Sequence, residues 1–223
     1  MLRDRAFTLI ELLVAIAIIA ILAALLLSVI GHAKARAQAV ACRCNLRQWG
    51  TATLLYAADH GDHLPPEGWH TPPLVPNKSA DTNSWYVLLP QTMGLPSYFE
   101  MPWRSNSDVK PGYSIWICPS NSRRSNGTNL FHYCLNEHVD DTGTSDHPIR
   151  LVSIPHPLVT VWMFDNGGRA PSAQWNNVHS NLHNHGAQFV FLDGHAAWFK
   201  NTAYWNPKTK KGLTNNPKLV WIP

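Results

Sequence analysis

The chain has 223 residues, of which only 14% are charged, and its formal net charge is +4 with the histidines neutral. The positive residues are scattered along the chain. No basic stripe is therefore available for nucleic acid, and no nucleic-acid partner is expected. Beyond the apolar N-terminal segment, enough sequence remains for one domain with its own core.

A long apolar segment begins close to the N-terminus. Residues Leu12 to Ile30 contain no charge. As a helix they would extend about 28 Å, close to the roughly 30 Å of a hydrocarbon core. Glu11 precedes them, and a carboxylate near a bilayer is costly enough that it usually has a partner. An ordinary secretory signal peptide, cleaved near Ala33–Ala39, is the alternative, but the length of the segment and Glu11 argue against it.

The residues before this segment resemble a known processing signal. The basic leader Met1–Arg5 is followed by Ala6 and then by Phe-Thr-Leu-Ile-Glu at residues 7–11. This is similar to the class III signal of type IV prepilins and pseudopilins, which usually have Gly where this chain has Ala6. The resemblance implies cleavage by a prepilin peptidase between Ala6 and Phe7 and methylation of the new N-terminus. It also implies that Glu11 pairs with the Phe7 amine of a neighbouring subunit during assembly.

The same resemblance implies a location and partners. A protein of this class is anchored by one helix in the bacterial inner membrane, with its globular domain extracytoplasmic or in an extracytoplasmic filament. Its partners are other pilin-like subunits, the inner-membrane assembly machinery and membrane lipid. The positive-inside rule does not favour a cytoplasmic N-terminus, because Lys34, Arg36, Arg43 and Arg47 follow the segment. The orientation therefore rests on the resemblance.

Helical sequence continues past the membrane segment. Ala33 to Ala58 is rich in alanine and lacks proline, and Gly61 is a typical stop. An approximate helical stripe is formed by Val40, Cys44, Trp49, Thr53 and Tyr56. We predict a leader at 1–6, a transmembrane and assembly helix at 7–30, the soluble half of the same helix at 31–60, and a globular pseudopilin-like domain at 61–223.

Two further stretches resemble a large family of pseudopilin-like bacterial proteins. Cys42, Asn45–Gln48, Tyr56–Asp59 and Pro65 are similar to its C…NLRQ…YAxD…P stretch. Near the C-terminus, His183 followed after nine residues by Asp193-Gly194 is similar to its H-x9-DG element. The resemblance identifies a class and suggests no chemistry. We interpret His183, Asp193 and Gly194 as structural, with His183 a hydrogen-bonded loop residue.

The second half of the chain favours β structure. We predict a helix or strand at Trp85–Leu89, a strand at Tyr113–Cys118 and a buried strand at Leu158–Phe164. A hairpin is expected from Ala187–Leu192 and His195–Lys200, joined by a two-residue Asp-Gly loop. That register pairs Phe189 with Trp198 and places Phe189, Phe191 and Trp198 on one face. The predicted fold class is α+β, with a long N-terminal pilin-type helix packed on a loop-rich domain that carries a C-terminal antiparallel sheet.

The four cysteines form no CxxC pair, so the sequence does not favour a zinc ribbon. Outside the cytoplasm a disulfide can form. Cys118 and Cys134 flank a polar loop and are the better candidate pair. Cys42 and Cys44 lie two residues apart on a predicted helix and point in different directions. The alternative is that all four are small buried residues or free thiols.

The sequence contains no G-x-S-x-G, P-loop or Rossmann fingerprint and no Cys/His/Asn spacing that suggests a nucleophile, so we expect no enzyme, cofactor or bound metal. Alternatives remain. His179, His183 and His185 could converge on a metal from one loop, as in a secreted metal enzyme. The acidic loop Asp140–Asp146 could bind calcium, as some major pseudopilins do, although it lacks full EF-hand spacing. The ten tryptophans could include a sugar-binding platform on a membrane-tethered binding module, although core packing is their commoner use.

Overall fold

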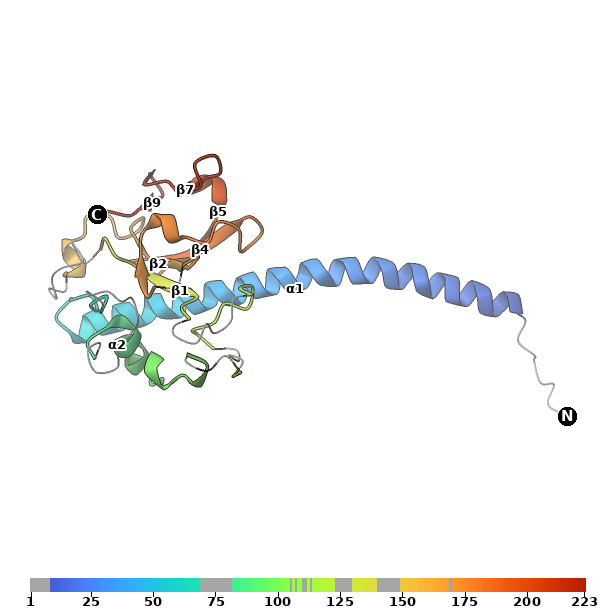
Figure 1. Cartoon of the computed structure of the whole chain (residues 1–223), viewed down its shortest axis with the longest axis horizontal. Coiled ribbons are helices and arrows are strands. Elements are labelled where there is room, and N and C mark those ends of the chain that lie inside the picture. Colours follow the sequence, from blue (N-terminus) through green and yellow to red (C-terminus); the bar gives the residue numbers. More distant parts are fainter. Residues whose placement is uncertain are drawn as a thin grey trace. The chain divides into compact units, whose positions relative to one another are not determined.

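The structure is a computed structural model that describes residues 9–68, 82–104, 106, 108–109, 112, 114–122, 130–139, 149–168 and 170–223. Its helices and strands, in chain order, are α1 (Leu9–Asp59), α2 (Trp85–Thr92), β1 (Tyr133–Asn136), β2 (Val161–Asp165), β3 (Ser172–Ala173), β4 (Gly186–Phe191), β5 (Ala196–Lys200), β6 (Trp205–Asn206), β7 (Lys211–Gly212), β8 (Asn215–Asn216) and β9 (Leu219–Val220) (Figure 1). Short 3-10 helices span Tyr98–Glu100, Pro102–Arg104, Leu151–Ser153, Trp175–Asn177 and Asn201–Ala203.

By its internal contacts the chain divides into two compact units, Met1–Ala37 and Gln38–Pro223. In the first unit, α1 exposes its apolar side chains. One of its 18-residue windows has a mean hydropathy of 3.2 and no buried residue, so the helix is long and apolar enough to cross a membrane. The last part of α1, from Gln38 to Asp59, belongs to the second unit. The boundaries predicted at residues 6, 30 and 60 stay predictions.

The predicted α+β class is confirmed: a long N-terminal helix is followed by a sheet in the C-terminal part of the chain. The main sheet has the strand order β3-β1-β2-β4-β5. Its neighbours are antiparallel except β1 and β3, which run parallel. The sheet is therefore mixed rather than purely antiparallel. Its three inner strands, β1, β2 and β4, are buried along their whole length.

One face of α1 in the second unit is buried in the core. Its fully or nearly fully buried side chains are Cys42, Leu46, Trp49, Ala52, Thr53, Tyr56 and Ala57. Their spacing of three or four residues is that of a single helical face. The predicted stripe is correct for Trp49, Thr53 and Tyr56. It is wrong for Val40, which is 49% exposed, and for Cys44, which is exposed.

The sheet separates two hydrophobic clusters, because successive strand residues point to opposite faces. In β1, Tyr133 and Leu135 belong to the cluster that contains the buried face of α1, whereas Cys134 belongs to the other. In β4, Val190 faces the helix side, and Phe189 lies in the second cluster with C-terminal residues such as Trp221. Apolar contacts on both faces explain why the central strands are buried along their whole length.

Gly50 marks the closest approach between α1 and the sheet. A Cβ atom placed on Gly50 would lie 2.6 Å from Val190 Cγ2 and 3.1 Å from both the Cα and the carbonyl oxygen of Gly194. These distances are shorter than a methyl group can accept without movement of its neighbours. The helix therefore rests directly on backbone at the hairpin turn.

The predicted hairpin forms, but its register is wrong by one residue. Phe191 donates its N–H to the carbonyl of His195, and Gly194 donates to the carbonyl of Phe191. The loop thus contains three residues, with Gly194 at φ 85°. This matches the hairpin in which a type I turn is followed by a residue in the left-handed region.

The extra loop residue changes which side chains share a face. Phe189 pairs with Ala197, and Trp198 pairs with Gln188. A shift of one residue moves a side chain to the opposite face of the sheet. Phe199, rather than Trp198, therefore packs with Phe189 and Phe191, at ring centroid distances of 5.7 and 6.1 Å.

The other local predictions have mixed outcomes. Trp85–Leu89 is helical, as part of α2, and the buried strand begins later than expected, at Val161. The strand prediction for residues 113–118 is wrong over its described part, where the chain forms turns. Its carbonyl groups are instead satisfied by α1: Asn45 Nδ2 donates to Ser114 and Ile117, and Trp49 Nε1 donates to Ile115.

We predict that Gly50→Ala lowers the free energy of unfolding, although alanine is the better helix former by about 1 kcal/mol. Overpacking of this kind typically costs about 1–3 kcal/mol, because Val190 and the Gly194 backbone must move. The change is measured by thermal unfolding of the full chain in detergent, monitored by the near-ultraviolet circular dichroism of the tryptophans.

Gly31→Ala is the matched control, because a Cβ there meets nothing within 4 Å. It should leave the melting temperature unchanged or raise it. Equal behaviour of the two variants would contradict the close packing at Gly50.

Candidate functional site

His183, the first residue of the H-x9-DG element, is buried beside a carboxylate. Its Nε2 lies 3.1 Å from Oδ2 of Asp165, the last residue of β2, and the two side chains are 1% and 0% exposed. The same oxygen accepts the backbone N–H of Gln188 at 2.6 Å. His183 therefore links the segment before β4 to the end of the central strand β2.

The backbone of His183 also holds the edge of the sheet. Its N–H donates to the carbonyl of Gly186 at 3.0 Å. Its carbonyl accepts the indole N–H of Trp198 at 2.8 Å. Through these bonds the residue fixes the entry to β4 and reaches across to β5, in keeping with the expectation of a hydrogen-bonded loop histidine.

A disulfide lies against the same imidazole. Cys42 of α1 is bonded to Cys118, with their Cα atoms 4.9 Å apart, and Cys118 Sγ is 3.5 Å from His183 Nε2. The predicted Cys118–Cys134 disulfide is therefore wrong. Cys134 points to the face of β1 opposite to the helix, whereas Cys42 and Cys118 both lie on the helix side.

Tyr133 completes the buried polar cluster. Its hydroxyl accepts a hydrogen bond from Asn45 Nδ2 at 3.2 Å and lies 3.5 Å from the carbonyl of Cys42, to which it donates. Burial raises the pKa of Tyr133 well above its usual value, and the negative charge of Asp165 raises it further. The phenol therefore stays neutral and can act as a donor. Asn45, interpreted from sequence as a plain polar helix position, is thus a bridge between α1, β1 and the 114–117 turn.

The arrangement does not support nucleophilic catalysis. A relay would need Asp165 and Cys118 on different nitrogens of His183, but both contact Nε2. The sulfur is already bonded to Cys42, and all these groups are buried. The cluster joins α1 to the loop before β1, to β1 and to β2 through a disulfide and hydrogen bonds.

The described part of the chain does not support the hypothesis that His179, His183 and His185 bind a metal together. His183 is buried, His185 is exposed, and the group that could hold a metal consists of Cys42, Cys118 and His183. In the disulfide, the two sulfurs are not thiolates, which are the form that binds zinc. The acidic loop proposed for calcium, Asp140–Asp146, lies outside the described residues.

The second half of the H-x9-DG element forms the hairpin turn. Asp193 Oδ1 accepts the backbone N–H of His195 at 3.1 Å and contacts His195 Nδ1 at 2.6 Å. Gly194 follows at positive φ, and a Cβ on it would meet Leu54 Cδ1 at 2.9 Å. A residue with a side chain is disfavoured here by both the backbone angle and the contact with α1.

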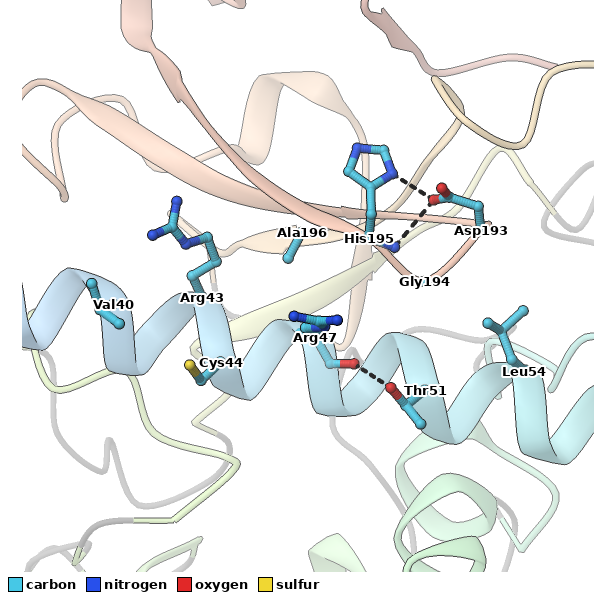
Figure 2. Close-up of a pocket in the computed structure, with 10 residues that line it drawn as sticks. All are labelled: Val40, Arg43, Cys44, Arg47, Thr51, Leu54, Asp193, Gly194, His195 and Ala196. Carbon is cyan, nitrogen blue, oxygen red and sulfur yellow. Dashed lines mark hydrogen bonds and ion pairs between the residues drawn. The ribbon is translucent and has the colours of Figure 1, made fainter.

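A surface cavity of about 670 Å³ lies where this turn meets α1. It is lined by Val40, Arg43, Cys44, Arg47, Thr51, Leu54, Asp193, Gly194, His195 and Ala196 (Figure 2). The two stretches that carry the second resemblance therefore meet at one place: Arg47 comes from the first, and Asp193 and Gly194 come from the second. Sequence reasoning missed this cavity, because no local pattern joins residues so far apart.

The remaining predicted residues lie in the first unit. Glu11 is exposed on the first turn of α1, while Ala6 and Phe7 lie outside the described residues.

Most of the described tryptophans pack in the core. The buried ones are Trp49, Trp85, Trp103, Trp116, Trp162 and Trp221. Among the described tryptophans only Trp198 is exposed, at 38%, so they do not form a platform of three exposed rings.

Comparison with protein families matches the N-terminus of the chain to a known motif. Residues 1–27 match the prokaryotic N-terminal methylation motif. No curated protein and no solved structure matches the chain. The match supports a type IV pilin-like protein in general, and together with the apolar helix it fits a single-pass membrane anchor.

We predict that the double variant Cys42→Ser/Cys118→Ser loses roughly 2–4 kcal/mol of unfolding free energy, because the disulfide closes a long loop. Denaturant unfolding in detergent measures the loss. Cys44→Ser is the control and should stay within about 0.5 kcal/mol, because Cys44 is exposed and outside the bond. A peptide map that joined Cys118 to Cys134 would contradict the assignment.

We predict that His183→Ala costs roughly 3–5 kcal/mol, because it leaves the buried Asp165 carboxylate without its imidazole partner. His195→Ala removes a similar imidazole–carboxylate contact at the surface, where the two side chains are 45% and 26% exposed. It should cost no more than about 1 kcal/mol. Denaturant unfolding measures both losses. Equal losses of unfolding free energy in the two variants would show that burial does not increase the contribution of the His183–Asp165 pair.

Proposed function

We propose that the chain is a structural subunit of a type IV pilus-like or type II secretion pseudopilus-like filament. It is made as a precursor, processed by a prepilin peptidase and assembled through its N-terminal helix. The observation that carries the proposal is the methylation motif at residues 1–27, which coincides with the start of an exposed apolar helix. Proteins with this motif are typically building blocks rather than enzymes.

In this proposal the chain is the substrate of the processing reactions and catalyses none of them. Cleavage between Ala6 and Phe7 frees an amine at Phe7, which the same enzyme class methylates. The amine retains its positive charge, and Glu11 of a neighbouring subunit supplies the opposite charge. A carboxylate at the head of an apolar helix is costly in a membrane unless it is paired. An ion pair between subunits lets it enter an apolar helical bundle.

The second unit would form the extracytoplasmic part of the subunit. Its buried disulfide fits that location, because disulfides persist in oxidising compartments. Within it, His183, Asp193 and Gly194 act structurally. His183 links the segment before β4 to Asp165 at the end of β2. The Asp193-Gly194 turn has no side chain at Gly194 and so lets α1 pack closely against it. None of these residues is assigned a catalytic role.

We predict that the mature chain begins at Phe7 and carries an N-terminal methyl group. Mass spectrometry of the protein purified from membranes measures both. Co-expression with an inactive prepilin peptidase is the control and should leave the chain beginning at Met1. A mature N-terminus in the Ala33–Ala41 region would identify an ordinary signal peptide and remove the filament proposal.

We predict that Glu11→Ala leaves cleavage and membrane insertion intact but weakens assembly, because the Phe7 amine of the neighbouring subunit loses its partner. Crosslinking in membranes should trap fewer multimers than in the parent. Asp59→Ala is the control, since it removes an exposed carboxylate from the other end of the same helix. If the two variants assemble equally well, Glu11 has no pairing role.

A further inference from the structure

The cavity between α1 and the β4–β5 hairpin has the size of a binding site. Its volume of about 670 Å³ lies within the roughly 300–1,000 Å³ of pockets that hold organic ligands. It is far larger than one phosphate or carboxylate group would need, since a water molecule in the liquid takes up only about 30 Å³. Its dimensions therefore suit a segment of a larger molecule rather than a single inorganic ion.

The charges that line the cavity favour an anion. Arg43 and Arg47 lie one helical turn apart on α1, and like charges at this spacing repel each other. Among the residues that the structure describes, neither guanidinium group has an ion-pair partner. Figure 2 shows both side chains standing on α1 beside the hairpin residues His195 and Ala196.

The carboxylate on the cavity wall does not neutralise this pair. Asp193 uses Oδ1 for its own turn, where it holds both the backbone N–H and the imidazole of His195. The lining thus carries two permanent positive charges against one carboxylate, so a positive charge remains. An incoming carboxylate would relieve the repulsion between the arginines, and the guanidinium fork binds such a group through two parallel hydrogen bonds.

Apolar side chains stand beside the arginines. Val40 and Leu54 lie on the α1 side of the cavity, and Ala196 lies on the hairpin side. Val40 is 49% exposed, so it offers apolar surface to a partner. The ligand that fits is therefore one that presents carboxylates next to small apolar groups.

We propose that this cavity is a docking site for an acidic peptide segment of a partner protein, with a carboxylate held between Arg43 and Arg47. The segment lies along α1 and covers Val40, Leu54 and the turn at Gly194. The site joins the two stretches of the chain that carry the second resemblance, and it gives the exposed arginines and the hairpin turn a shared role. It does not depend on cleavage at Ala6 or on assembly through Glu11.

Cys44 provides a direct readout, because it lines the cavity and its thiol is exposed. The buried Cys134 serves as an internal control for intact folding. The full chain in detergent is treated with an alkylating reagent, with and without a short synthetic peptide of alternating glutamate and valine. We expect the peptide to slow Cys44 alkylation several-fold, to lose this effect at high salt, and to leave Cys134 unmodified throughout.

The matched variants are Arg43→Gln/Arg47→Gln and Lys208→Gln/Lys218→Gln. Each removes two exposed positive charges, but only the first pair lines the cavity. Protection, taken as the ratio of rates with and without peptide in each variant, should vanish in the arginine pair and persist in the lysine pair. Because all four side chains are exposed and glutamine is a good helix former, circular dichroism should be unchanged.

Three results would overturn the proposal. The first is equal protection by a peptide with glutamine in place of glutamate. The second is equal protection by inorganic phosphate alone, which would indicate a simple anion site. The third is protection by anionic phospholipid vesicles but not by the peptide, which would indicate a membrane surface. Because processing at Ala6 is not involved, none of these results bears on the filament proposal.

Discussion

The contact between Gly50 of α1 and the turn at Gly194 sets the spacing between the helix and the sheet. No side chain separates the two backbones there, so Trp49 and Thr53, on either side of Gly50, can reach into the core. Thr53 accepts the indole N–H of Trp162 at 2.8 Å, and Trp49 packs edge-on against Trp85 and Trp116. A side chain larger than glycine at either contact point would lift the helix from the strand that carries Val190. The last part of α1 is therefore a core element of the second unit.

Buried polar groups fix the same arrangement more specifically than apolar contacts can. The Cys42–Cys118 bond ties α1 to the loop before β1, and Asn45 ties it to the 114–117 turn and to Tyr133. Next to them the His183–Asp165 pair ties the start of the hairpin to β2. Burying such a pair gives little net stability, but removing one partner is strongly destabilising. The cluster thus disfavours alternative positions of the helix on the sheet.

Local patterns in the sequence predicted most of the helices and strands. Contacts between residues far apart in the chain could not be predicted from those patterns. The apolar run, the helix through residue 58 and the hairpin follow from composition and turn residues alone. Asp193-Gly194 suits both a two-residue and a three-residue loop, so the register came out wrong and Trp198 was placed on the wrong face. The disulfide was missed because the partner of Cys118 depends on which face of β1 Cys134 occupies. The arginine-lined cavity was missed because Arg43 and Asp193 meet only in the folded chain.

Amide hydrogen exchange of the full chain in detergent tests most directly whether the last part of α1 is a core element. If it is, the amides of residues 46–57 should exchange only when the amides of β4 do, with the same opening free energy, because both belong to one cooperative unit. Reduction of the Cys42–Cys118 bond should then lower the protection of both by the same amount. Helix amides that exchange orders of magnitude faster while β4 stays protected would contradict the account.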